Sequence, residues 1–320
     1  MTQPDGKKIV VLGTGGTIAG TAASLGDNIG YTAAQVGVDQ LLCAIPALGA
    51  SLGGYAMLTE QVAQLDSKDM SFEVWQRLAG RVAHWLARPG VQGIVITHGT
   101  DTLEETAYFL QAILNPAKPV VLTCAMRPAT AVAPDGPQNV LDAVAVATHP
   151  GARGVVAVCA GTIHGAFDVQ KVHPYQINAF NSGDAGPLGY VEEGVLRLVR
   201  SWPETKAGPT QLTIENIVNN TRWPRVEIVM NYTGANGSLV EALVAQGVQG
   251  LVVAATGNGT LHHDLEAALL VAQRGGVKVV RASRCPNGRV LGQPGDAIAD
   301  SQGLSAVKAR VALMLALMPA

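Results

Sequence analysis

Short apolar runs alternate along the chain with segments that have the spacing of amphipathic helices. In the first 200 residues, runs rich in valine and isoleucine lie at 8–13, 93–97, 119–123 and 154–160. Runs that are apolar at every position are typical of parallel strands buried on both faces. The clearest helical pattern spans 71–88, where Trp75, Leu78, Val82 and Trp85 fall on one face. This alternation predicts an α/β fold with a doubly wound sheet.

A second series of the same patterns follows a polar, proline-containing stretch at 201–213. Its strand patterns lie at 225–230, 250–255 and 277–282, and its helical patterns at 238–246, 262–275 and 305–318. The stretch between the two series has the composition of a linker. We therefore expect a larger N-terminal domain at 1–200, a linker at 201–224, and a smaller C-terminal α/β domain at 225–320.

The amino-acid composition indicates which kinds of binding partner to expect. Hydrophobic residues make up 48% of the chain and charged residues only 14%, which is low for a fully solvated surface and predicts an oligomer. The net charge of −2 includes no basic run that could follow nucleic acid or an anionic membrane, so neither is expected as a partner. The apolar run at the N-terminus is too short for a signal core or a membrane span. The cytoplasm is the default expectation, and the periplasm stays open if a signal was removed.

Cysteine and histidine spacing gives no sign of a metal site. Four cysteines lie far apart without a CxxC pair, and we expect free, buried thiols at Cys43, Cys124, Cys159 and Cys285. The histidines lack metal-ligand spacing, and the doublet at 262–263 is more typical of a helix start. We expect neither a metal nor an organic cofactor.

Polar residues cluster directly after predicted strands, where open α/β sheets bind ligands. The first strand is followed by a glycine-rich turn that ends in Gly16-Thr17. It is not a dinucleotide fingerprint, because Ile18 stands where that motif needs glycine or alanine. The glycines would instead let backbone amides approach a small ligand and present the Thr17 hydroxyl. A plain turn is the alternative interpretation.

The strand at 93–97 is followed by His98-Gly99-Thr100-Asp101 and then by a helix start. Thr102 and Glu105 have the spacing of a capping box, which explains part of the segment. Capping does not require the hydroxyl of Thr100 or the carboxylate of Asp101, and both would face the ligand crevice.

A threonine nucleophile needs a neighbouring base. Lys171 is one choice, because burial would lower its pKa while Asp101 would orient it. Tyr31 is a second possible proton acceptor, close to Thr17. The alternatives are a solvated surface lysine and a tyrosine that only packs.

Two motifs, TGGTIAG at 14–20 and ITHGTDTLEETAYF at 96–109, resemble the signatures of the bacterial-type L-asparaginase family. Their joint occurrence is highly specific, and the resemblance extends along nearly the whole chain. It is closest to the tetrameric type II members of the asparaginase/glutaminase superfamily. Further similar segments lie at 31–33, 66–70, 125–128, 168–171, 186–189 and 257–259.

The resemblance implies an amidohydrolase that converts L-asparagine to L-aspartate and ammonia. It implies a homotetramer, a dimer of dimers, with each active site built between the larger domain of one subunit and the smaller domain of its neighbour. The catalytic residues implied by the family motifs are Thr17, Tyr31, Thr100, Asp101 and Lys171.

The same resemblance assigns the substrate contacts. Ser67 and the backbone near Asp66 would hold the substrate carboxylate, Asp101 its ammonium, and Ala125 would line the amide pocket. Asn258 would contribute from the neighbouring subunit. Backbone amides near Gly16 and Thr100 would stabilise the oxyanion.

Two positions depart from the family pattern. Lys68 stands where type II members carry glutamine or glutamate, which places a cation near the substrate ammonium. We expect Lys68 to turn outward and pair with an acid, or to reach the substrate carboxylate. The segment 285–303 contains no glutamate to act from the neighbouring subunit, and Asp296 is a possible substitute.

Two other functions stay open from sequence alone. One is a glutaminase-asparaginase of mixed specificity, because one methylene changes binding by only about 1 to 3 kcal/mol. The other is a non-catalytic amino-acid-binding subunit. Retention of Thr17, Thr100, Asp101 and Lys171 together argues against the binding subunit.

Overall fold

The computed structural model describes residues 7–24, 26–204 and 212–319. The chain divides into two compact units, Met1–Pro209 and Thr210–Ala320. The division falls inside the stretch 201–224 that was expected to be a linker. Part of this stretch is ordered within the units, because Trp202 is buried in the core of the first and a short helix, α6 (Ile214–Val218), follows in the second.

The first unit is built on a mixed sheet with the strand order β12-β11-β8-β7-β6-β5-β1-β4. Its parallel strands are β1 (Lys8–Gly15), β4 (Ala56–Leu65), β5 (Val91–Thr97), β6 (Pro119–Thr123) and β7 (Gly154–Cys159). Strands β8 (Thr162–Gly165), β11 (Gly189–Glu192) and β12 (Val195–Leu198) continue the sheet antiparallel. Two small ribbons pair β2 (Thr21–Ala22) with β3 (Tyr31–Thr32), and β9 (Gln170–Lys171) with β10 (Phe180–Asn181). The four strands expected in this region are present, and β4 and the antiparallel strands are additions.

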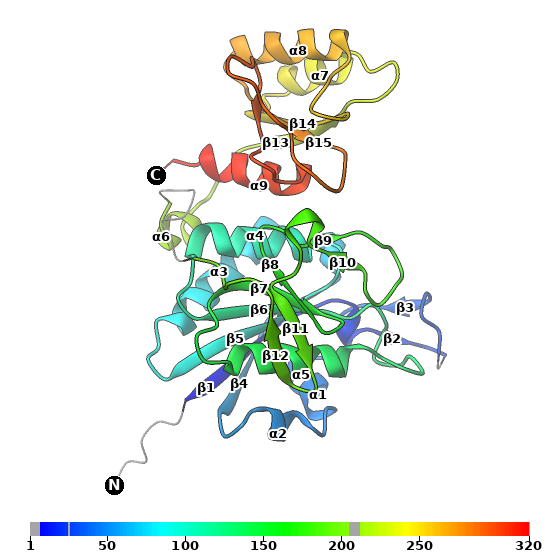
Figure 1. Ribbon diagram of the computed structural model, residues 1–320, viewed down its shortest axis with the longest axis vertical. Coiled ribbons are helices and arrows are strands. Elements are labelled where there is room, and N and C mark those ends of the chain that lie inside the picture. Colours follow the sequence, from blue (N-terminus) through cyan, green and yellow to red (C-terminus); the bar gives the residue numbers. More distant parts are fainter. Residues whose placement is uncertain (1–6, 25, 205–211, 320) are drawn as a thin grey trace. The chain divides into compact units, whose positions relative to one another are not determined.

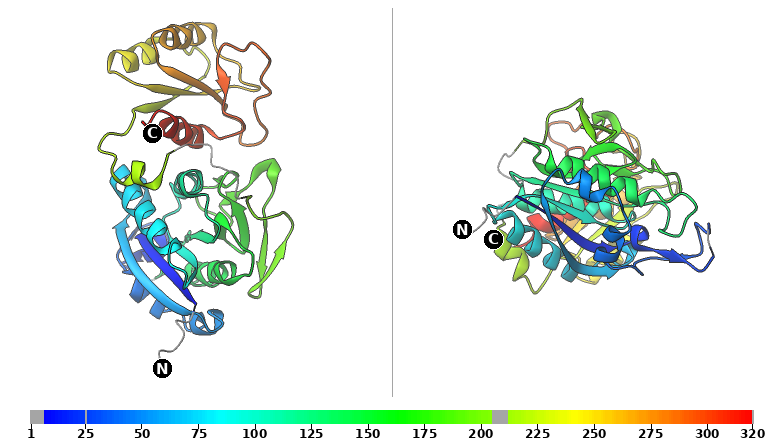
Figure 2. Two further views of the ribbon diagram at one scale, coloured as in Figure 1. Left: turned by 90° about the vertical axis from the view of Figure 1, so that its left-hand side faces the viewer. Right: turned by 90° about the horizontal axis from the view of Figure 1, so that it is seen from below.

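Helices cover both faces of this sheet, which confirms the doubly wound architecture (Figures 1 and 2). Helices α1 (Val38–Cys43), α2 (Leu48–Ser51) and α5 (Gly136–Thr148) pack on one face. Helices α3 (Phe72–Leu86) and α4 (Leu103–Leu114) cover the other, where Trp75 stacks on Phe109 with ring centroids 4.6 Å apart. Within the described ranges, no helix is both long and apolar enough to cross a membrane.

The second unit is a smaller parallel sheet with the order β13-β14-β15-β16. Its elements are β13 (Val226–Met230), α7 (Ser238–Ala245), β14 (Gly250–Ala255), α8 (His263–Arg274), β15 (Lys278–Ser283), β16 (Ala299–Asp300) and α9 (Ala306–Ala316). Helices α7 and α8 share an apolar core with one face of the sheet, and α9 packs against β13, β14 and β15. The expectation of a smaller α/β domain is met, and helix α8 begins at the histidine doublet as predicted.

The cysteines differ in part from the prediction. All four are free, but Cys43 and Cys285 are exposed, because Cys43 is the last residue of α1 and Cys285 lies in a bend after β15. Cys124 and Cys159 are buried, and their sulfur atoms lie 3.2 Å apart. They are neighbours because they follow or end the adjacent strands β6 and β7.

Candidate functional site

The strand order places four expected site segments side by side. Strands β6, β5, β1 and β4 are consecutive and parallel in the sheet, so their carboxyl ends share one edge. Ala125 follows β6, Thr100 follows β5, Thr17 follows β1 and Ser67 follows β4. The chain leaves β1 for β4 on one side and returns to β5 on the other, which is the topological switch point where such sheets bind ligands.

Glycines let these segments approach backbone to backbone. A Cβ atom added to Gly16 would lie 2.4 Å from the Cα atom of Gly99, and one added to Gly99 would lie 2.4 Å from the Ser67 Oγ. Gly16 also has a φ of 84°, in the region that disfavours other residues. Only glycine fits both positions, so the backbone segments that carry Thr17 and Thr100 approach each other closely at these glycines.

Thr17 begins a short 3-10 helix (Thr17–Ala19) directly after β1, and its side chain is largely buried. Its hydroxyl lies 2.7 Å from the phenolic oxygen of Tyr31, on β3. The residue that could accept its proton is therefore already in hydrogen-bond contact with it. Tyr31 lies in the β2–β3 ribbon that follows Thr17.

A second hydroxyl, that of Thr100, is bonded to the amine of Lys171. The Lys171 Nζ donates to the Thr100 Oγ1 at 2.8 Å and to the Asp101 Oδ1 at 2.6 Å. The Lys171 side chain is 17% exposed and that of Asp101 is 50% exposed, so the amine is shielded while the carboxylate reaches solvent. Strand β9 presents Lys171 to the helix start after β5. The three side chains form a triad of hydroxyl, amine and carboxylate.

Ser67 follows the end of β4 and contacts the segment that follows β5. Its Oγ accepts the backbone N–H of Asp101 at 3.1 Å, and its carbonyl accepts the Thr102 hydroxyl at 2.9 Å. Asp66 accepts the Lys68 ammonium at 2.9 Å, and the Lys68 side chain is 64% exposed. The hydrogen bond and charge of Asp66, with further charge from Asp69 and Asp101, raise the pKa of Lys68. Lys68 therefore stays cationic, with its charge partly neutralised by Asp66.

One sequence expectation about this region is wrong, and a second meets a competing hydrogen bond. The Thr102 side chain makes no cap on α4, because its hydroxyl is donated to the Ser67 carbonyl instead. The Gly16 amide is donated to the Leu65 carbonyl at 2.9 Å, so this N–H cannot also stabilise an oxyanion. The physical reason is the same in both cases, because a carbonyl at or just after the end of β4 accepts a hydrogen bond from a group that the local sequence leaves free.

The sequence analysis gave no role to His98, which is fully buried under the site. Its Nδ1 lies 2.7 Å from the Gly99 carbonyl and its Nε2 lies 3.0 Å from the Thr106 hydroxyl. A carbonyl can only accept, so Nδ1 carries the proton, and Nε2 accepts from Thr106, whose oxygen accepts the Trp75 indole N–H at 2.9 Å. Burial lowers the pKa of His98 to about 4, so the imidazole is neutral. Thr106 lies on α4 and Trp75, which bonds to Thr106, lies on α3, and no local spacing signals this chain of hydrogen bonds.

In the second unit, Asn258 and Asp296 both have partners. The Asn258 amide accepts the Leu291 N–H at 2.7 Å and donates to the Leu291 carbonyl at 3.3 Å. Asp296 accepts the Arg281 guanidinium at 2.6 Å. The Gln293 backbone N–H and Arg281 lower the pKa of Asp296. Its carboxylate is thus ionised and already paired with a cation of its own unit.

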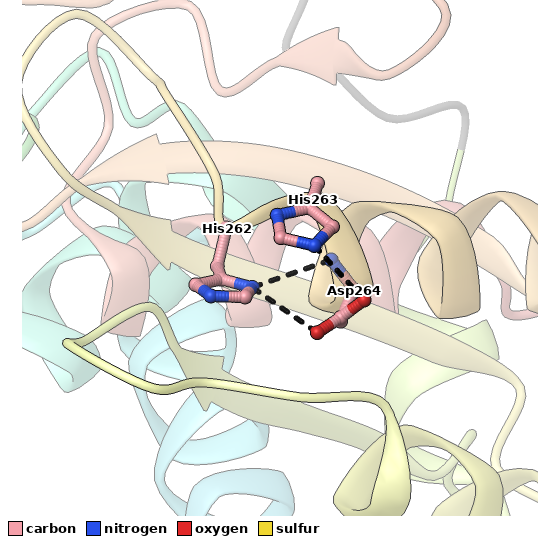
Figure 3. Close-up of side chains that lie close together, drawn as sticks. All are labelled: His262, His263 and Asp264. Carbon is pink, nitrogen blue, oxygen red and sulfur yellow. Dashed lines mark hydrogen bonds and ion pairs between the residues drawn. The ribbon is translucent and has the colours of Figure 1, made fainter.

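The histidine doublet belongs to one group of possible metal ligands among the described residues, His262, His263 and Asp264 (Figure 3). The two imidazoles stack, with ring centroids 4.5 Å apart and planes 22° apart. Imidazole lone pairs lie in the ring plane, so stacked rings do not direct them at a common ion. His262 Nδ1 also accepts the Asp264 backbone N–H at 3.3 Å as the cap of α8. The geometry is that of a helix cap.

Comparison with known proteins shows the family. Residues 8–204 match the family described as "Asparaginase, N-terminal", and residues 225–319 match the "Glutaminase/Asparaginase C-terminal domain". The chain is 38% identical to L-asparaginase 2 of Escherichia coli (strain K12), over 97% of this chain and 88% of that protein. It is 37% identical to a glutaminase-asparaginase of Pseudomonas fluorescens biotype A, over 97% and 86%.

A solved structure agrees with these sequence matches. The crystal structure of a probable cytoplasmic L-asparaginase from Campylobacter jejuni superposes with a TM-score of 0.90 at 38% identity, covering 98% of this chain and 96% of that chain. The fold and the site thus define an amidohydrolase class of α/β enzyme. The chain belongs to the asparaginase family. The family prediction made from the two motifs is confirmed.

Proposed function

We propose that this chain is an L-asparaginase that hydrolyses L-asparagine to L-aspartate and ammonia by threonine nucleophilic catalysis. One observation carries the proposal. Two threonine hydroxyls at adjacent strand ends each touch a side chain that can exchange a proton, Thr17 with Tyr31 and Thr100 with Lys171. Amide hydrolysis by an activated hydroxyl needs this kind of pairing.

In the proposed reaction, the Thr17 Oγ attacks the side-chain carbonyl carbon of asparagine. Its proton passes to Tyr31 or to the Thr100–Lys171 pair. The carbon–nitrogen bond then breaks, and the nitrogen leaves as ammonia after receiving a proton. Water attacks the resulting ester, releases aspartate and restores the Thr17 hydroxyl. Because the Gly16 amide is committed to Leu65, we expect the oxyanion donors to be other backbone amides near Gly16 and near Thr100.

The substrate's own charges would be held beside these hydroxyls. Asp101 is half exposed and can accept the substrate ammonium while its Oδ1 stays bonded to Lys171. Ser67 and the backbone near Asp66 would receive the carboxylate, and Ala125 would border the amide. Lys68 pairs with Asp66 in the free protein, which agrees with the outward-facing hypothesis and reduces its repulsion of the ammonium.

Mixed activity on glutamine is the second candidate function. The relative from Pseudomonas fluorescens is named a glutaminase-asparaginase, and it matches this chain about as well as the L-asparaginase does. A pocket that must accept one further methylene differs in binding by only about 1 to 3 kcal/mol. Ammonia release from asparagine, from glutamine and from buffer alone separates the two activities from a binding-only protein.

The replacement Thr17→Ala tests the mechanism. We expect kcat for asparagine to fall by about 10⁴-fold, because the nucleophile is lost while the substrate contacts remain. Thr21→Ala, on β2 just after the same turn, is the matched control and should keep kcat within about threefold. Undiminished turnover in Thr17→Ala would move the nucleophile to another residue.

We further propose a homotetramer, a dimer of dimers, in which Asn258 contributes to the site of a neighbouring subunit. The low proportion of charged residues and the exposed apolar side chains Val195, Leu239 and Leu291 support burial between copies. The molar mass in solution tests it, and a monomer that is fully active would contradict it. The cytoplasmic location stays a prediction.

A further inference from the structure

The turn that carries Ala125 joins β6 to α5, and it is held from the start of α5. The two carboxylate oxygens of Asp135 accept consecutive backbone N–H groups of this turn. Oδ2 accepts from Met126 and Oδ1 from Arg127, both at 2.9 Å. A bidentate grip of this kind fixes the direction of the two peptide planes that follow Ala125.

Asn139 lies one helical turn after Asp135 and is almost completely buried. Its Nδ2 donates to the Cys124 carbonyl at 2.9 Å and to the Asp135 Oδ2 at 3.2 Å, while its Oδ1 accepts the Ala160 N–H at 2.9 Å. Both amide protons are therefore used, together with the oxygen. This one side chain ties the residue before Ala125 to the end of β7.

The C-terminal part of the same turn contacts the segment that follows Thr17, the proposed nucleophile. The Ala129 N–H donates to the Gly20 carbonyl at 3.0 Å, and the Ala22 N–H donates to the Thr130 hydroxyl at 2.9 Å. The start of α5 also presses on this region, since a Cβ atom added to Gly136 would lie 2.8 Å from the Ile18 side chain. A shift of the turn would therefore be transmitted to the loop that bears Thr17.

The turn also lies within electrostatic range of Lys171, which donates to the Thr100 hydroxyl. Contact with the Cys159 thiol and burial raise the pKa of Cys124 well above its ordinary value, and the charges of Asp135 and Lys171 act on it in opposite directions. Lys171 is thus near the residue that precedes Ala125. The turn is bordered by α5 and by the segment 17–22, which bears Thr17.

We propose that Asp135 and Asn139 are positioning residues for amide hydrolysis, which hold the 124–130 turn so that Ala125 and the Thr17 loop keep a fixed separation. The inference rests on the proposed function, because it takes Ala125 as the border of the amide pocket. Neither residue touches the expected substrate, and both act through backbone groups of the turn.

Two variants and a matched control test the proposal in the full-length protein. Asp135→Asn replaces one acceptor with a donor that faces a backbone N–H, and Asn139→Ala removes every bond of the buried amide. Asp142→Asn is the control, because Asp142 lies on the same helix, is equally an aspartate, and bonds to Gln138 instead of the turn. Folding is checked by circular dichroism and thermal unfolding before any assay.

The readout is the ratio of kcat/KM for asparagine to kcat/KM for glutamine. A loss of folded protein lowers both values equally and leaves the ratio unchanged, whereas a displaced pocket border affects side chains of different length unequally. We expect the ratio to change by at least about fivefold in Asp135→Asn and Asn139→Ala, and by less than about twofold in Asp142→Asn.

The outcomes separate the two proposals. Wild-type protein that releases no ammonia from either amide overturns the proposed function. An active wild type whose ratio is unchanged in both folded variants overturns the positioning role alone. If Asp135→Asn does not fold, Asn139→Ala decides the question by the same criterion.

Discussion

Threonines follow parallel strands in both units, but their side chains have different kinds of partner. In the first unit, Thr17 touches Tyr31 and Thr100 touches Lys171. In the second unit, the Thr256 hydroxyl donates to the Thr260 carbonyl at 2.9 Å. A phenol or an amine can take part in proton transfer, whereas a backbone carbonyl is only an acceptor. Whether a strand-end hydroxyl can serve catalysis or only stabilise the fold therefore depends on its partner more than on its position.

Among the tests of this comparison, the largest effect is expected from removal of the Thr100 hydroxyl or of its partner Lys171. Thr100→Ala and Lys171→Met should each lower kcat for asparagine by about 10³-fold, because general acid–base groups contribute roughly 10² to 10⁴ in rate. Thr256→Ala is the counterpart in the second unit and should stay within about threefold of wild type. Steady-state kinetics on folded protein measures both. An equal loss of kcat in Thr256→Ala and in the two first-unit variants would contradict the comparison.

The next largest expected effect is a loss of stability at acidic pH, caused by the buried His98. Burial lowers the pKa of His98 to about 4 from an ordinary value of 6.5. Above pH 6.5 the imidazole is neutral in both the folded and unfolded states, so its full stabilisation is present. As pH falls from 6.5 to 4 the unfolded state binds the proton first, and we expect a loss of about 3 kcal/mol in the free energy of unfolding.

Denaturant unfolding at several pH values between 7 and 4 measures this loss. The pH dependence should shrink in His98→Gln and persist in His263→Gln, whose side chain is 85% exposed at the start of α8. A His98→Gln protein with the full wild-type pH dependence would show that other groups are responsible.

A smaller effect tests the structural role of the second unit's strand ends. Asn231 is buried, accepts the His262 N–H at 2.8 Å and donates to the Thr256 hydroxyl at 3.0 Å. Asn231→Ala leaves the His262 N–H without this acceptor and removes the donor to the Thr256 hydroxyl, and it should lower the free energy of unfolding by about 2 kcal/mol. The exposed Asn287→Ala is the control and should change it by less than about 0.5 kcal/mol. A stability unchanged in Asn231→Ala would contradict the structural assignment.

The smallest effect is expected at Lys68. Its ammonium is largely exposed and paired with Asp66, and exposed ion pairs contribute little free energy. Lys68→Gln should change the Michaelis constant for asparagine by less than about threefold, or roughly 0.7 kcal/mol. A large improvement in affinity would show that Lys68 opposes the substrate ammonium in the native site.

Strands and helices with strong periodicity could be predicted, whereas weakly patterned elements could not. The run at 119–123 became β6 and the run at 250–255 became β14 without change of bounds. Strand β4 was missed because its residues are mostly half-buried at the sheet edge, so no continuous apolar run marks it. Helix α5 was also missed, although it supplies the residues that hold the 124–130 turn.

The sequence by itself determined the family, the alternation of strands and helices, and the hydroxyl, amine and carboxylate groups after the strands. These follow from local patterns and from two short motifs. The tertiary structure alone decided which groups meet. It paired Thr17 with Tyr31, used the Gly16 amide on Leu65, and tied Ala125 to α5 through Asp135 and Asn139. Such contacts join residues that are distant in the chain and depend on strand order and close glycine packing, which no local spacing encodes.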